Sequence, residues 1–111
     1  MVKTSLGLEE NVAGALCYIL GWISGIVFFL LEKENRFVRF HAMQSVATFL
    51  PLTLIIWIIP ALFLWVPVVS WALLSLIRIL ILILWLVLMI KAYQGERYKL
   101  PIVGDFAEKQ I

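Results

Sequence analysis

One long apolar segment constrains the fold of this chain more than any other feature. From Ala42 to Ile90 the sequence carries a single charged side chain, that of Arg78. A helix crosses the hydrocarbon core of a bilayer, about 30 Å thick, with about 20 residues. The segment is therefore long enough for two crossings and too long for one. We expect it to form a helical hairpin within a membrane.

The composition of the whole chain supports a membrane location. Of its 111 residues, 64% are hydrophobic and 14% are charged, and the mean hydropathy is +1.06. A water-soluble domain of this length cannot bury so much apolar surface. We therefore predict an all-α integral membrane protein with a single transmembrane domain, residues 1–111.

Prolines and tryptophans indicate where the long segment turns. Pro67 lies within "WVPVVSW", where two tryptophans are typical of side chains at a membrane interface. A turn there predicts transmembrane helices at about 42–64 and 71–90, with Pro51 and Pro60 inside the first of them. The alternative is a break at Pro60, which would make "ALFLWVPVVS" a re-entrant or interfacial piece.

A third transmembrane helix is predicted at about 11–31, where about 20 residues carry no charge. Acidic residues precede this run, and no small-residue cleavage site follows it, so we do not interpret it as a signal peptide. With three crossings, the first loop and the C-terminal tail lie on the same side of the membrane.

The distribution of lysine and arginine predicts the orientation, because these residues remain in the cytoplasm. We expect a multi-pass protein of the cell membrane, with the N-terminus outside and the C-terminus in the cytoplasm. The topology determinants are the basic residues of the first loop and of the tail: Lys33, Arg36, Arg39, Lys91, Arg97, Lys99 and Lys109.

A polar stripe begins in the first loop and continues into the second predicted helix. His41, Gln44, Ser45 and Thr48 fall within an arc of roughly 100° on a helix. Polar side chains that face lipid are costly, so the stripe should face another helix or a water-filled vestibule. Interhelical hydrogen bonding is the main interpretation, and a polar lining of a transport path is the alternative. A catalytic or metal-binding role for His41 has little support, because Cys17 is most of a span away.

Glycines on the first predicted helix offer a surface for close packing. Gly14, Gly21 and Gly25 recur at spacings of seven and four residues, and "GWISG" is a pair of small residues that lets another helix approach. We predict contact between this surface and the polar stripe. A dimer interface is the alternative.

Arg78 is the most costly residue in the sequence because it lies deep in the third predicted helix. No acidic residue lies in any predicted span. We expect Tyr18 to bind Arg78, together with the carbonyl of Ile56, which Pro60 leaves without a helical donor. If the Arg78 side chain extends toward the membrane surface instead, its expected partner is Glu9 or Glu10. The alternative, functional interpretation is that Arg78 lines a path for anions or peptides.

The tail, residues 91–111, is predicted to dock on the cytoplasmic face of the membrane. Its sequence "YKLPIVGDFAEK" mixes aromatic and aliphatic residues with Pro101 and Gly104, and 105–109 can form one turn of helix. Such a short helix is stable only when docked. The tail is then an interfacial anchor, or alternatively a recognition element for a soluble partner.

Several motifs resemble a known family. The "EN" pair at Glu10 and Asn11, "FVRFHAMQS" at 37–45 and "GERYKLPIVGD" at 95–105 resemble the signature blocks of small, uncharacterised multi-pass membrane proteins of archaea and bacteria. That family is regarded as distantly similar to the channel subunit of the protein-import translocon in the chloroplast inner envelope. The resemblance implies a cell-membrane location and a multi-pass architecture. The translocon subunit has four spans, one more than we predict here.

These observations favour a protein that is not an enzyme. No nucleophile with a base, paired carboxylates, phosphate-binding glycine loop or metal ligand set is evident, so no catalytic residue, metal or cofactor is predicted. A net charge of +2 does not indicate nucleic-acid binding, and no small-molecule substrate is identifiable. The predicted partners are the lipid bilayer and further copies of the chain or a larger membrane complex. The alternative is a subunit of a protein-translocation or transport channel.

Overall fold

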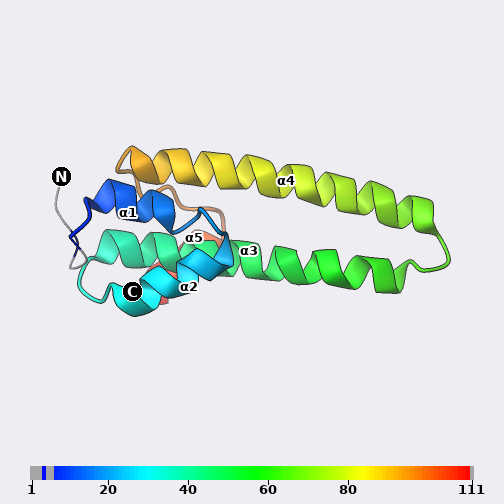
Figure 1. The fold of residues 1–111 in the computed structure, drawn as a ribbon, viewed down its shortest axis with the longest axis horizontal. Coiled ribbons are helices and arrows are strands. Elements are labelled where there is room, and N and C mark those ends of the chain that lie inside the picture. The colour runs from blue at the N-terminus through cyan, green and yellow to red at the C-terminus, as the bar shows by residue number, and fades with distance from the viewer. Residues whose placement is uncertain (1–3, 5–6, 111) are drawn as a thin grey trace.

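The computed structural model describes residue 4 and residues 7–110, and the regular structure of these residues is helical. Two long helices form a hairpin, and three short helices pack beside one half of it (Figure 1). In chain order the helices are α1 (Glu10–Leu16), α2 (Trp22–Leu31), α3 (Arg36–Leu62), α4 (Pro67–Tyr93) and α5 (Val103–Gln110).

The hairpin of α3 and α4 agrees with the predicted fold of the long apolar segment. Each of these helices has 27 residues, and both are long and apolar enough to cross a membrane. Pro67 is the first residue of α4, where its missing N–H has no helical partner to lose. Pro51 and Pro60 lie inside α3, as predicted. Compared with the predicted range 42–64, α3 begins earlier and also ends slightly earlier, at Leu62, whereas α4 extends beyond the predicted 71–90 at both ends.

The prediction of one transmembrane helix at 11–31 is wrong, because the chain turns at 17–21 between α1 and α2. Gly21 has φ +62°, a conformation that side chains with a Cβ rarely adopt. Ser24 stabilises the turn: its Oγ accepts a hydrogen bond from the backbone N–H of Leu20 (3.1 Å) and lies 2.9 Å from the carbonyl oxygen of Cys17.

The helices α1 and α2 form a re-entrant hairpin, which enters the bundle and returns to the same end. At its mouth, Asn35 Nδ2 donates to Glu10 Oε2 (3.0 Å). At its tip, Ser45 Oγ donates to the carbonyl oxygen of Gly21 (2.8 Å). Glu10 and the start of α3 therefore lie at one end of the molecule, as Figure 1 also shows. The structure has two candidate membrane spans rather than three, and the expectation that the N-terminus lies opposite the tail is not supported.

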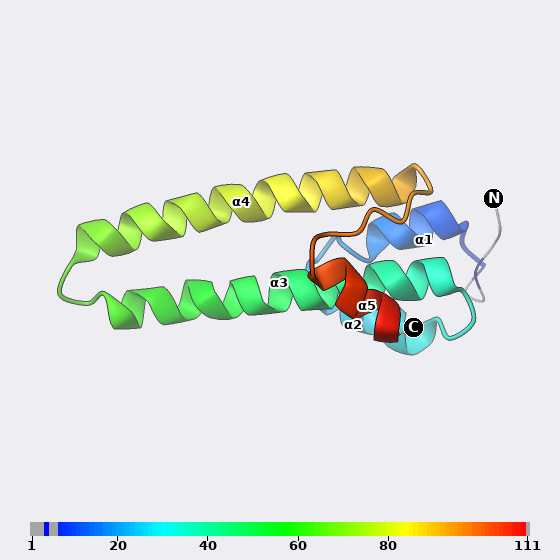
Figure 2. The ribbon, with the colours of Figure 1, turned by 180° about the vertical axis from the view of Figure 1, so that it is seen from behind.

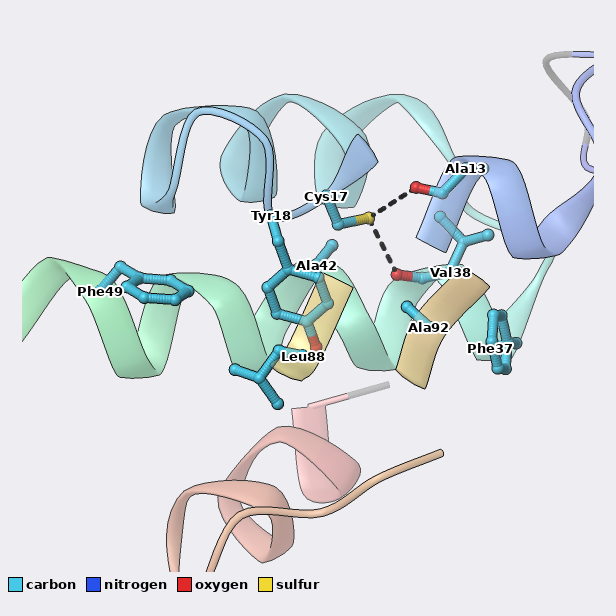
Figure 3. Packing of buried hydrophobic residues seen from close by; sticks show 9 residues of the cluster. All are labelled: Ala13, Cys17, Tyr18, Phe37, Val38, Ala42, Phe49, Leu88 and Ala92. Carbon is cyan, nitrogen blue, oxygen red and sulfur yellow. Dashed lines mark hydrogen bonds between the residues drawn. The ribbon is translucent and has the colours of Figure 1, made fainter. Parts of the chain in front are cut away.

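An apolar core joins the re-entrant hairpin to α3 and α4 (Figure 3). Small residues allow the helix backbones to approach closely here, and the Sγ of Cys17 lies 3.2 Å from the carbonyl oxygen of Ala13 and 3.7 Å from that of Val38. Cys17 is thus a packed core residue. The core cluster consists of Ala13, Cys17, Tyr18, Phe37, Val38, Ala42, Phe49, Leu88 and Ala92.

The C-terminal tail folds back over α3, and α5 lies against it (Figure 2). Lys99 fastens the tail to α5 through ion pairs with Asp105 and Glu108. The hydrogen bond that the Lys99 ammonium donates to Glu108 raises the pKa of Lys99 above its usual value. The helix is longer than the turn predicted at 105–109, because it begins at Val103.

The two candidate spans and the re-entrant hairpin predict from which side of the membrane each exposed position can be labelled. Cysteines placed one at a time at Glu9, Trp65 and Lys109, in a Cys17→Ala background, are exposed positions for a membrane-impermeant thiol reagent. We expect positions 9 and 109 to be labelled from the same side and position 65 from the opposite side. Labelling of positions 9 and 65 from one side would mean that the first apolar run crosses the membrane.

Candidate functional site

The polar stripe of α3 is buried inside the monomer. His41, Gln44 and Ser45 are fully buried and Thr48 is 6% exposed. Three elements cover the stripe: the turn between α1 and α2, the helix α2, and the extended tail that precedes α5. The stripe therefore faces protein rather than lipid.

Gln44 connects the tail to the re-entrant hairpin. Its Oε1 accepts a hydrogen bond from the backbone N–H of Leu100 (3.1 Å), and its Nε2 donates to the carbonyl oxygen of Tyr98 (2.8 Å). The same Nε2 donates to the hydroxyl of Tyr18 (3.1 Å). The amide thus pairs with the backbone of the tail as a neighbouring strand would, and uses its remaining proton on the hairpin.

These bonds determine where the protons of the network lie. Tyr18 Oη accepts from Gln44 and lies 2.6 Å from Nδ1 of His41, to which its own proton can be donated. Nε2 of His41 lies 2.9 Å from the carbonyl oxygen of Glu96, which can only accept. Nε2 of His41 therefore carries a proton. A continuous chain of hydrogen bonds runs from Gln44 through Tyr18 and His41 to the tail.

The tip of the hairpin packs against the deeper part of the stripe. A Cβ added at Gly25 would lie 2.7 Å from the carbonyl oxygen of Ala42 and 3.0 Å from the Cβ of Ser45. Gly14 has a similar role against Phe37, whose ring would lie 2.8 Å from an added Cβ. The Oγ1 of Thr48 is buried and has no hydrogen-bond partner among the described residues.

Other residues of this site were not predicted from the sequence. Trp85 of α4 donates its indole N–H to the carbonyl oxygen of Tyr18 (2.6 Å). Arg39 donates to the carbonyl oxygens of Phe29 and Glu32, both at 3.0 Å, and so caps the C-terminus of α2. A sequence signal did exist for the turn, since Gly21 and Ser24 interrupt an otherwise apolar run. The backbone groups of the tail left no such signal.

The predicted pairing of Arg78 with Tyr18 is wrong. The hydroxyl of Tyr18 is bound by His41 and Gln44, and its carbonyl is bound by Trp85, about two turns along α4 from Arg78. The reason is the re-entrant hairpin, which returns before it reaches the depth of Arg78. The Arg78 side chain is exposed on the outer surface of α4. Glu9 and Glu10, the alternative partners, lie at the mouth of the hairpin.

The predicted topology determinants lie in the half of the molecule that holds the short helices. Arg39 is partly buried by its bonds to α2, and Lys91 pairs with Glu96 at 3.3 Å. Arg97 lies over the ring of Phe40, 5.7 Å from its centroid. Among the described basic residues, Arg78 is the one placed in the opposite half.

The polar groups of this site hold parts of the chain together. Among residue 4 and residues 7–110, no group of three or more His, Cys, Asp or Glu side chains could bind a metal ion. The donors and acceptors of His41, Gln44 and Tyr18 are used within the chain. The network fixes the hairpin and the tail to α3.

Comparisons with known proteins place this architecture among membrane proteins. Residues 6–107 match the magnetosome magnetite crystal formation protein family. A UPF0132 membrane protein of Methanocaldococcus jannaschii is 56% identical over 95% of this chain and 72% of its own length. A second from that organism is 50% identical over 98% of this chain and 94% of its own length. A UPF0132 membrane protein of Archaeoglobus fulgidus is 47% identical over 94% of this chain and 97% of its own length.

No solved structure matches this chain. The matches show a family of membrane proteins, and they do not show the expected likeness to the chloroplast translocon subunit.

Replacing Gln44 by leucine should release the tail. The substitution leaves the carbonyl of Tyr98 and the N–H of Leu100 without partners, each at a cost of about 1–3 kcal/mol if they remain buried. We expect faster amide hydrogen exchange at Leu100 and throughout α5 in Gln44→Leu. Met43→Leu, at the neighbouring partly buried position, is the control and should leave exchange unchanged. Equal protection of the tail in both variants would contradict this role.

The close approach at Gly25 predicts a loss of stability in Gly25→Ala. The added methyl group must displace the backbone of Ala42, so the free energy of unfolding should fall by about 1–3 kcal/mol. Val27→Ala, on the exposed face of the same helix, should change it by about 0.5 kcal/mol or less. Reversible unfolding in detergent micelles measures both. A Gly25→Ala protein as stable as the parent would disprove the packing.

Proposed function

This chain belongs to the UPF0132 and magnetosome magnetite crystal formation family of membrane proteins, and we propose that it is a non-enzymatic membrane component that assembles with itself or with a larger membrane complex. The assembly uses the outer surfaces of α3 and α4. The buried polar network maintains the fold of each subunit and takes no part in chemistry. The family name refers to magnetite crystal formation, and the proposed assembly rests on Arg78 rather than on that name.

Arg78 is the observation that supports assembly. Its side chain is exposed near the middle of α4. A charge at the centre of a bilayer costs about 3 kcal/mol on insertion scales and more in simulations. No Asp or Glu lies between Phe40 and Ile90 to compensate it. A neighbouring subunit that covers this part of α4 removes the cost by supplying hydrogen-bond acceptors.

An acceptor of this kind lies on α3. Pro60 has no N–H, so the carbonyl of Ile56 lacks its usual helical donor. Measured from the turn at 63–66, Ile56 and Arg78 differ in depth by roughly 7 Å, which the long arginine side chain can bridge. In an assembly of identical chains, Arg78 of one copy can thus bind the free carbonyl of the next. A partner helix with a carboxylate would satisfy it equally well.

We also propose that the half with the short helices faces the cytoplasm. The described part of that half contains seven of the nine basic residues of the chain, and Lys3 lies outside the described residues. Positive residues are retained on the cytoplasmic side. The start of α1 and the tail are then both cytoplasmic.

A channel function has less support. In the alternative interpretation, the polar stripe from His41 to Thr48 lines a path, yet its side chains are covered by the hairpin and the tail. Opening a path along the stripe would break the network in which these side chains bind. No observation on α3 or α4 favours the channel over assembly.

Substitution of Arg78 tests the assembly directly. We expect Arg78→Leu to shift the protein from its larger assembly toward the monomer, because the polar contact between subunits is lost. Arg78→Lys should retain part of the assembly. Leu82→Ala removes an exposed side chain one turn further along α4 and is the control for a general loss of contact area. The mass in native nanodiscs or mild detergent measures the effect, and an unchanged mass for Arg78→Leu would refute the proposal.

A further inference from the structure

The helices are distributed unequally between the two halves of the molecule. The half that holds the start of α3 and the end of α4 also contains α1, α2 and α5, whereas the other half contains only α3 and α4 among the described residues (Figures 1 and 2). The ten residues of α2 span about 15 Å, which is half of a hydrocarbon core of about 30 Å. The re-entrant hairpin thus has the length of one leaflet.

The surface of the hairpin is suited to lipid tails. No charged residue lies between Asn11 and Leu31, and the charges before and after this run lie at the mouth of the hairpin. Its outward-facing side chains are aliphatic and at least 36% exposed, so water contact would be unfavourable. They are Ile19, Leu20, Ile23, Ile26, Val27, Leu30 and Leu31.

The tail adds further apolar surface in the same half. Ile102 is 84% exposed and Phe106 is 50% exposed, and both border a shallow cavity of about 410 Å³ between α5 and the α3 residues Val46 and Leu50. The two acidic residues of α5, Asp105 and Glu108, pair with Lys99. A helix with one apolar and one charged face lies in the plane of the membrane interface.

The cross-section of the protein therefore differs between the leaflets. With a helix diameter of about 10 Å, each additional helix occupies roughly 80 Å² in the plane of the membrane. The hairpin alone adds roughly 160 Å² to one leaflet, and α5 adds area near the headgroups. The opposite leaflet accommodates only two helices.

We propose that this chain acts as a wedge in one leaflet, and that its lipid partner is a bilayer curved convexly toward the half with the hairpin. An inclusion that expands one leaflet is accommodated with least strain where that leaflet is already stretched. The protein then concentrates in curved membrane and, at high density, bends flat membrane. The wedge is a property of the single chain, so it does not depend on the assembly proposed above.

Membrane tethers pulled from giant vesicles test the wedge. The whole protein, labelled with a fluorophore at Lys109→Cys in a Cys17→Ala background, is reconstituted, and protease access to the tail identifies its orientation. With the hairpin in the outer leaflet, we expect the ratio of protein to lipid on an outward tether to exceed that on the vesicle. With the hairpin in the inner leaflet, the ratio should fall below it. The proposal is overturned if the protein-to-lipid ratio is equal on the tether and on the vesicle, or if the tether differs from the vesicle in the same way in both orientations.

A pair of lysine substitutions tests the part played by the hairpin. Leu20 lies at the tip, deep in the leaflet, and Leu31 lies at the mouth, and the two are similarly exposed (66% and 58%). A charge at the tip should draw the hairpin toward the headgroups, so Leu20→Lys should lose the enrichment on tethers. Leu31→Lys adds the same charge at the surface and should retain it. Equal enrichment in the two variants would exclude the hairpin as the cause, and if Leu20→Lys does not fold, the two orientations of the parent protein decide.

Discussion

The hydrogen bond between Tyr18 and His41 is the contact on which the rest of the structure depends. It joins the tip of the re-entrant hairpin to α3, and through the other nitrogen of His41 it extends to the tail at Glu96. Each donor in this network faces a group that can accept. In a medium of low dielectric constant such a network is strong when complete and costly when one member is missing. The hairpin and the tail are for this reason fixed together.

The sequence predicts the α3–α4 hairpin well and the first apolar run poorly, for a physical reason. Pro67 and the tryptophans around it mark a turn by their own chemistry, so local residues are sufficient. For residues 11–31, length and hydropathy indicate that the segment is stable in lipid. They do not indicate whether the chain crosses the membrane or turns back within it. A pair of half-length helices has the same hydropathy as one full crossing. The distinguishing signal is the conformation of Gly21, together with a serine that binds the turn.

The polar stripe illustrates a second limit of prediction. Helical periodicity correctly places His41, Gln44 and Ser45 on one face, because that follows from 3.6 residues per turn. Their partners do not follow from any pattern, because three of them are backbone groups of the tail, at Glu96, Tyr98 and Leu100. Every residue has such groups. The same gap applies to the predicted pair of Tyr18 and Arg78, because a similar depth on two helices does not reveal that the Tyr18 hydroxyl binds His41 and Gln44 of α3.

The polar network and the proposed wedge are connected through rigidity. A re-entrant hairpin expands a leaflet only if it stays inserted, and an unsupported pair of helices of seven and ten residues is too short to be stable alone. Here the tip is bound by Ser45, His41 and Trp85, so moving the hairpin toward the surface breaks buried hydrogen bonds as well as apolar contacts. The lipids of that leaflet therefore rearrange around the hairpin, because moving the hairpin costs more free energy. The polar residues inside α3 act on the membrane indirectly, by making the apolar surface around them stiff.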